Sequence, residues 1–288
     1  MLKQTVLFHN LTMSEHFLQV DGAKICYEVK GNGPYIVCIS GGDGGYKQFI
    51  PLRDRLVKHF TVVLYNRRGY SKSILASPQD FSKRVEIDAS DLYETMKSLT
   101  NTDFSIFASS SSGIVALKYI FTHPDTVRTC FLHEPMIDLF ALPEGDYALD
   151  FRQEGYEIYN KYGRGAAILH SGKKYFNKLD YYYTVERQLQ NMASSGDYHF
   201  EHEPSQYLFT EVDMKKANTY KDKMVLIYGL ESFNSFVHLP IAEFSKSLEK
   251  EMVEFPGGHI GFFTEYEKFA VKFIKLCRDH SLINHPNL

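Results

Sequence analysis

The amino-acid sequence predicts an α/β fold in which a mostly parallel, eight-stranded sheet has helices on both faces. Three observations lead to this prediction. Short apolar runs of strand length alternate with longer stretches of helical spacing. Several of these runs are apolar throughout, as in strands that are buried on both faces. A strand-like run also turns directly into a helix at four consecutive serines, residues 109–112. The 288 residues, 44% of them hydrophobic, suffice for one large core.

The first half of the predicted sheet begins with a hairpin. Asp21-Gly22 is a two-residue turn signal between two alternating segments. The following run at 35–39 is uninterrupted and apolar, which is typical of a strand in the middle of a parallel sheet. The predicted strands of this half are 17–20, 24–29, 35–39, 61–65 and 104–107, and the predicted helices are 49–60, 85–99 and 111–122.

The second half of the pattern contains an insertion. After a strand at 127–133, the alternation of strands and helices stops from about 136 to 218 and then resumes. The resumed elements are strands at 223–228 and 251–255 and helices at 242–248 and 265–277. We therefore expect a core made of residues 1–135 and 219–288, with 136–218 as a helical lid.

The expected lid is rich in tyrosine, whose large apolar ring and polar tip suit the wall of a ligand pocket. Because pocket walls use few residues, we expect most of these side chains to pack the lid on itself. The tyrosines are Tyr147, Tyr156, Tyr159, Tyr162, Tyr175, Tyr181, Tyr182, Tyr183, Tyr198 and Tyr207.

Composition and charge exclude several classes of partner. The formal net charge is −3 and no cluster of basic residues is present, so we expect no nucleic-acid partner. No apolar stretch approaches about 18 residues and no secretory signal is visible, so we expect a cytoplasmic protein without a membrane partner. The widely spaced cysteines are expected to be free thiols: Cys26, Cys38, Cys130 and Cys277.

The serine run is the strongest candidate for chemistry. A nucleophile held on a tight strand-to-helix turn needs small residues two before it and two and three after it. For Ser110 these neighbours are Ala108, Ser112 and Gly113, whereas Ser111 would place the bulky Ile114 at a close contact. A serine-rich loop that caps a helix is the alternative. The spacing therefore favours Ser110 as the nucleophile.

Several segments resemble the α/β-hydrolase superfamily, and the resemblance covers nearly the whole chain. Residues 40–45 are similar to the family's His-Gly-Gly-Pro-Gly-Gly loop, with serine and aspartate replacing histidine and proline. Residues 66–73 resemble its Asp-x-Arg-Gly-x-Gly-x-Ser segment. His123-Pro124 stands thirteen residues after Ser110, the usual spacing. The His-Glu-Pro at 133–135 and the Phe-Pro-Gly-Gly-His at 255–259 resemble poorly characterised bacterial hydrolases.

The resemblance implies a histidine base and a carboxylate that orients it. His259 stands in a glycine-rich loop after the last predicted strand, where the family keeps its base. The usual aspartate position is Ser232 here, with Glu231 beside it. A second acid position is known in haloalkane dehalogenases and related luciferases, and Glu134 matches it. A carboxylate at the end of a buried strand also needs a partner, because burial of an unpaired charge is costly. We therefore favour Glu134 as the acid and keep Glu231 as the alternative.

The backbone amides of Gly42 and Ser111 are expected to form the oxyanion hole. The glycine-rich loop lacks the spacing of a phosphate-binding or dinucleotide-binding loop, so we expect no nucleotide cofactor. His199 and His202 stand beside Glu201 and Glu203, but no further histidine or cysteine completes a ligand set, so we expect no metal.

These expectations define a cofactor-independent serine hydrolase for a small-molecule substrate. A carboxylesterase that acts on small or medium apolar esters through an acyl-enzyme is the function we favour. Because the nucleophile position is serine, dehalogenation by carboxylate attack is not expected. The same scaffold supports amide, lactone and carbon–carbon bond hydrolysis and acyl transfer. A non-catalytic protein that binds a ligand under the lid is a further alternative.

Overall fold

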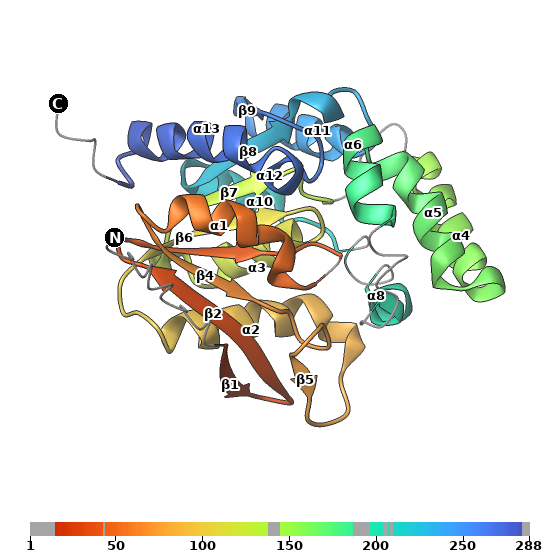
Figure 1. Ribbon diagram of the computed structural model, residues 1–288, viewed down its shortest axis with the longest axis horizontal. Helices are drawn as coiled ribbons and strands as arrows, with labels where there is room; N and C mark the ends of the chain where they lie inside the picture. The colour runs from red at the N-terminus through yellow and green to blue at the C-terminus, as the bar shows by residue number, and fades with distance from the viewer. Residues whose placement is uncertain are drawn as a thin grey trace, which may run out of the picture.

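The computed structural model describes residues 15–42, 44–137, 145–186, 196–203, 207 and 210–283. A nine-stranded sheet runs through the middle of this part of the chain (Figure 1). Its strands are β1 (His16–Val20), β2 (Ala23–Gly31), β3 (Tyr35–Ile39), β4 (Thr61–Tyr65), β5 (Ile74–Leu75), β6 (Phe104–Ser109), β7 (Val127–His133), β8 (Met224–Gly229) and β9 (Met252–Phe255).

The strand order is β1-β2-β4-β3-β6-β7-β8-β9, with β5 paired to β2 away from this path. β2 is antiparallel to β1, β4 and β5, whereas all pairs from β4 to β9 are parallel. The predicted fold class is confirmed, but the expected number of eight strands was one too low. β5 has only two residues, which is too short to produce a recognisable alternation.

Helices cover both faces of the sheet and bury two apolar clusters. Successive side chains of a strand point to opposite faces. In β3, Ile36 and Cys38 therefore pack in one cluster, whereas Val37 and Ile39 pack in the other. The first cluster includes residues of α1 (Ile50–Leu56), α12 (Gly261–Thr264) and α13 (Tyr266–Asp279). The second includes residues of α2 (Arg84–Lys97), α3 (Ser112–Thr122) and α11 (His238–Leu248). The four cysteines are buried free thiols, as predicted.

Two helices differ in their bounds from the predicted ones, and each has a proline in its first turn. A 3-10 turn (Tyr46–Phe49) leads into α1, which contains Pro51 and ends at Leu56, so it is shorter than the predicted 49–60. α11 begins at His238 instead of 242, with Pro240 in its first turn. A proline is tolerated there because the first N–H groups of a helix have no intrahelical acceptor. In both helices the proline therefore lies inside the first turn.

The segment from 136 to 218, called the insertion below, adds helices but no strand within its described residues. Figure 1 shows α4, α5, α6 and α8 grouped to one side of the sheet. The insertion contains α4 (Gly145–Tyr162), α5 (Arg164–Tyr175), α6 (Lys178–Tyr181), a π-helical turn (Tyr182–Glu186), α8 (Gly196–His202) and most of α10 (Met214–Tyr220).

The tyrosines of the insertion differ in their burial. Tyr207 is buried, whereas Tyr156, Tyr162 and Tyr182 are exposed. The side chain of Tyr147 lies outside the described part of the chain. Among the residues that the structure describes, no helix is long and apolar enough to cross a membrane.

Candidate active site

Ser110 occupies the sharp turn between β6 and α3. Its φ angle is 60°, in the left-handed region that costs a non-glycine residue roughly 1–2 kcal/mol. The Ser110 N–H donates to the carbonyl of His133 at 3.1 Å. The Ser110 carbonyl in turn accepts from the amides of Gly113 (2.9 Å) and Met136 (3.1 Å). These bonds hold the strained backbone, and the turn presents a half-buried serine side chain at the carboxyl end of β6.

The residues around this turn have to be small. A Cβ atom added to Gly113 would lie 2.3 Å from the Cβ atom of Pro135. A Cβ atom added to Gly41 would lie 2.7 Å from the Cβ atom of Ser110. Both distances are far shorter than an ordinary van der Waals contact. The small residue expected at position 113 is therefore required, and Gly41 brings the loop after β3 directly against Ser110.

The other three serines of the run are buried. The Ser112 hydroxyl accepts from the Ser109 amide at 3.0 Å and lies 2.8 Å from the Ile39 carbonyl, to which it donates. The Ser109 hydroxyl lies 3.4 Å from Nδ1 of His133. The Ser111 hydroxyl has no hydrogen-bond partner among the described residues. Ser110 is therefore the most accessible serine of the four.

His259 and Glu134 form a buried pair beside the serine turn. Nδ1 of His259 lies 2.8 Å from Oε2 of Glu134, and the two residues are 3% and 0% exposed. The Gly229 amide donates to the other carboxylate oxygen, Oε1, at 2.8 Å. The carboxylate therefore accepts from Nδ1, and in the neutral ring Nε2 is left as the atom that can take a proton. Glu134 follows β7 and His259 follows β9, so both stand at the carboxyl edge of the sheet.

The charges at this pair are set by opposing effects. Burial alone would raise the pKa of the Glu134 carboxyl. The hydrogen bond from His259, the neighbouring imidazoles and the Gly229 amide outweigh burial and hold that pKa below its usual value. Burial lowers the pKa of His133 to about 4, so this adjacent imidazole is neutral at pH 7. The pair therefore has an ionised carboxylate next to a neutral His133 ring.

The alternative acid, Glu231, lies in a different environment. Its side chain is exposed, and its Oε2 accepts from Nδ2 of Asn177 at 2.8 Å. Its backbone amide donates to the carbonyl of Gly257 at 3.0 Å. Ser232, at the family's usual aspartate position, is buried. The structure therefore brings Glu134, and not Glu231, into hydrogen-bonding contact with His259.

The two amides expected in the oxyanion hole belong to neighbouring loops. Gly42 follows β3 and Ser111 follows β6, and these strands are adjacent in the sheet. Arg67 holds the loop after β3 because its guanidinium group donates to the carbonyls of Ser40 (3.0 Å) and Gly41. Asp43 in this loop lies outside the described residues.

A buried ionic cluster joins the insertion to the core. Arg67 and Arg84 of the core face Glu203 of the insertion, and Arg67 also pairs with Asp88 at 3.2 Å. The Tyr207 hydroxyl donates to Asp88. Arg67 therefore makes two kinds of contact, because the guanidinium group that pairs with these carboxylates also holds the loop that carries Gly42. Sequence reasoning missed this cluster because its members in the core and its members in the insertion are more than a hundred residues apart.

The insertion also contacts the loop that carries His259. Asp180 is fully buried in α6, and it accepts from the Ile260 amide (3.2 Å) and the Thr264 hydroxyl (2.7 Å). The rings of Tyr175 and Phe176 lie with their centroids 6.1 Å from that of His259. Nothing in the sequence pattern indicated these contacts. The insertion is therefore part of the surroundings of the His259 loop.

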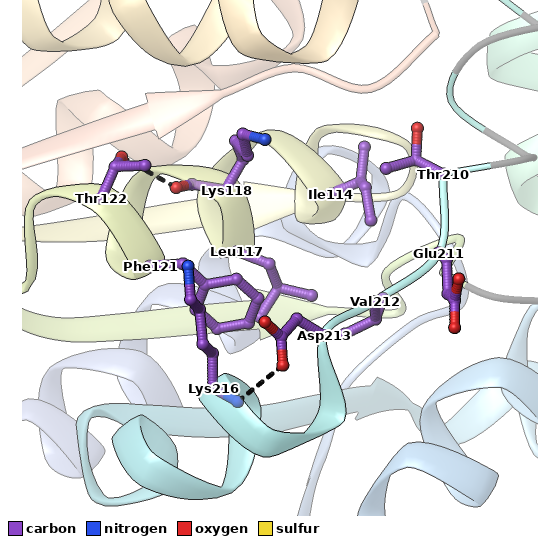
Figure 2. Close-up of a pocket in the computed structure, with 10 residues that line it drawn as sticks. All are labelled: Ile114, Leu117, Lys118, Phe121, Thr122, Thr210, Glu211, Val212, Asp213 and Lys216. Carbon is purple, nitrogen blue, oxygen red and sulfur yellow. Dashed lines mark hydrogen bonds between the residues drawn. The ribbon is translucent and has the colours of Figure 1, made fainter.

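A cavity of about 160 Å³ lies apart from these residues. Figure 2 shows the residues that line it. Ile114, Leu117 and Phe121 of α3 face Val212 and the start of α10 across it. Asp213 caps α10 by accepting from the Lys216 amide at 3.0 Å. Ser110, Glu134 and His259 do not line this cavity.

Comparisons with known proteins agree with this architecture. The model of the alpha/beta hydrolase fold family matches residues 34–266. The Uncharacterized hydrolase YraK of Bacillus subtilis (strain 168) is 30% identical over 260 residues, which are 90% of this chain and 94% of YraK.

Solved structures of low sequence identity share the fold. The enol-lactonase from Burkholderia xenovorans LB400 is 17% identical with a TM-score of 0.69, over 91% of this chain and 100% of that one. A thermophilic esterase from Thermogutta terrifontis is 14% identical with a TM-score of 0.75, over 93% and 99% of the two chains.

The fold, the strained serine turn and these matches define a hydrolase of the α/β class. The chain belongs to the alpha/beta hydrolase fold family, as its sequence motifs predicted. Hydrolysis of a small molecule is the activity that this membership supports.

Proposed function

We propose that the protein is a cofactor-independent serine esterase that cleaves small or medium apolar esters through an acyl-enzyme. Ser110 is the nucleophile, His259 the base and Glu134 the acid. The observation that carries the proposal is the buried 2.8 Å contact between His259 and Glu134 beside the strained turn at Ser110. A serine hydroxyl is a weak nucleophile, and a base oriented by a carboxylate is what activates it.

The reaction follows from the tautomer of His259. Ser110 Oγ attacks the ester carbonyl carbon while its proton passes to Nε2 of His259, and the carbonyl electrons move onto the oxygen. Collapse of this intermediate breaks the bond to the alcohol, which leaves with the proton from His259. Water then attacks the acyl-enzyme with His259 again as base, which releases the acid and restores Ser110. Glu134 stays ionised throughout and stabilises the imidazolium.

The amides of Gly42 and Ser111 are proposed to donate to the oxyanion of the tetrahedral intermediate. Backbone donors need no reorganisation when the negative charge develops, which makes them effective in a partly dehydrated site. The guanidinium group of Arg67 supports this role because it holds the loop of Gly42 through two carbonyls.

The preference for apolar esters rests on the side chains near His259. The ring centroids of Tyr175 and Phe176 are each 6.1 Å from that of His259, and Phe236 packs edge-on against Tyr175 with ring centroids 5.4 Å apart. Met136 and Val237 are buried in the same small apolar cluster as Tyr175 and Phe236. We propose that residues 136–218 act as a lid that covers the site with the rings of Tyr175 and Phe176.

A fluorophosphonate probe tests the nucleophile and the enzyme class together. The probe forms a covalent bond with an activated serine, so we expect labelling of the wild-type protein at Ser110, located by mass spectrometry of the digested protein. A panel of p-nitrophenyl esters of increasing acyl length then measures the substrate range. Labelling at Ser111 would contradict the assigned nucleophile, and no labelling with no ester turnover would favour a ligand-binding protein.

We expect Asp180→Ala to lower turnover roughly 10- to 100-fold, because small displacements of catalytic groups have effects of this size. The substitution leaves the buried Ile260 amide without its acceptor, which should also lower the free energy of unfolding by about 1–3 kcal/mol. Ester kinetics and thermal unfolding measure the two effects. Asp222→Ala is the control, since that side chain is exposed and should change stability by less than about 0.5 kcal/mol. An unchanged kcat in Asp180→Ala would show that the insertion does not position His259.

A further inference from the structure

His199 of α8 lies against the loop of the proposed oxyanion hole. A Cβ atom added to Gly42 would lie 2.8 Å from Cε1 and 3.4 Å from Nε2 of His199. The preceding residue, Gly41, lies close to the proposed nucleophile, because a Cβ atom added to Gly41 would lie 3.3 Å from Ser110 Oγ. Consecutive Cα atoms are only about 3.8 Å apart. The imidazole of His199 and the Ser110 hydroxyl therefore contact adjacent residues of one loop.

The orientation of His199 is set by a buried carboxylate. Nδ1 of His199 lies 3.1 Å from Oε2 of Glu203, and the Glu203 side chain is only 1% exposed. Burial would raise the pKa of that carboxyl, but the charge of Arg67 and the bond with His199 outweigh burial and lower the pKa. Arg67 donates to the same Oε2 atom at 3.0 Å. An ionised carboxylate only accepts hydrogen bonds, so the proton stands on Nδ1 and the neutral ring has Nε2 as an acceptor.

This arrangement repeats the contact between Nδ1 of His259 and the Glu134 carboxylate. In its neutral form the His199 ring offers Nε2 as an acceptor, and the side chain is 30% exposed. Catalysis by the proposed triad needs only one base, and His259 already supplies it. The second oriented imidazole is therefore available for recognition of the substrate.

We propose that His199 is a specificity-determining residue whose Nε2 accepts a hydrogen bond from a hydroxyl group on the acyl part of the substrate. The proposal rests on the proposed esterase function, which places the scissile carbonyl oxygen at the Gly42 amide. A hydroxyl on one of the two carbon atoms that follow that carbonyl then lies beside Gly42 and its neighbour His199. Among the small esters proposed above, the favoured class is therefore esters of short hydroxy acids.

A matched pair of esters tests the proposal. The p-nitrophenyl esters of butyric acid and 3-hydroxybutyric acid differ by one hydroxyl group, and kcat/KM is measured for both. His199→Phe keeps a ring but removes the acceptor. We expect it to lower the ratio of kcat/KM for the hydroxy ester to kcat/KM for butyrate about 10- to 100-fold, because the substrate hydroxyl loses its hydrogen-bond acceptor.

Two further variants separate recognition from folding. His202→Phe is the matched control, because His202 is on the same helix but stacks on Phe81 with ring centroids 3.8 Å apart. We expect it to leave the ratio of the two kcat/KM values unchanged. His199→Gln retains an acceptor and should restore part of the ratio. If His199→Phe does not fold, His199→Leu, which also lacks an acceptor, replaces it.

The outcomes distinguish this inference from the proposed function. An unchanged ratio in folded His199→Phe, or in folded His199→Leu used in its place, with wild-type activity and labelling of Ser110 intact, would overturn the role of His199 alone. A wild-type protein that hydrolyses neither ester and takes no fluorophosphonate label would overturn the proposed function, and this inference with it.

Discussion

Ser110→Ala is expected to lower kcat for ester hydrolysis by about 10⁶-fold, the order of magnitude lost when a serine protease loses its nucleophile. The substitution removes the oxygen atom that forms the acyl-enzyme and keeps the Cβ atom that packs on Gly41. Binding of substrate should change little. The measurement is steady-state kinetics on p-nitrophenyl butyrate together with the burst of product that reports the acyl-enzyme.

The neighbouring serines are the controls for this experiment. Ser111→Ala removes a hydroxyl that has no hydrogen-bond partner in the described residues and keeps the backbone amide, so we expect a measurable part of the activity. Ser109→Ala should also retain activity. Ser112→Ala should retain activity but lose stability, because its hydroxyl joins β6 to the Ile39 carbonyl. Loss of activity in Ser111→Ala with retention in Ser110→Ala would move the nucleophile by one residue.

Much of the fold could be predicted because its signals are local. β3 and β4 have the predicted bounds, since a strand buried in the middle of the sheet is a mostly apolar run between polar or turn residues. β5 was missed because its two residues carry no periodicity, and pairing with β2 is what defines it. α11 begins at His238, four residues before the predicted start, and Pro240 lies in its first turn, where a proline is tolerated.

The candidate site also has parts that local sequence signals predict and parts that they do not. The spacing of small residues identified the turn at Ser110, and the end of a buried strand identified Glu134 as a carboxylate that needs a partner. The contacts from the insertion could not be read from the sequence. Glu203 meets Arg67 across 136 residues of chain, and Asp180 meets Ile260 across 80. Only the packing of the insertion on the core creates these pairs, so no local pattern reports them.

Glu134→Gln is expected to lower turnover by roughly 10⁴-fold, the loss known for the corresponding change in a protease triad. Glu134 accepts two hydrogen bonds, one from the Gly229 amide and one from His259. Glutamine has a single side-chain oxygen, so it can accept only one of them. With that oxygen on Gly229, the NH₂ group faces Nδ1 of His259 and forces the proton onto Nε2. The ring then cannot take the proton from Ser110.

Glu231→Gln is the matched control, because the same change is made at an exposed carboxylate that accepts from Asn177. We expect its turnover to stay within about threefold of wild type, since the lost interaction is on the surface. Thermal unfolding must first show that both variants are folded, because an unpaired buried group can lower stability without a change in mechanism. If folded Glu134→Gln kept normal turnover while Glu231→Gln lost it, the acid would lie after β8, and the His259–Glu134 contact would have only a structural role.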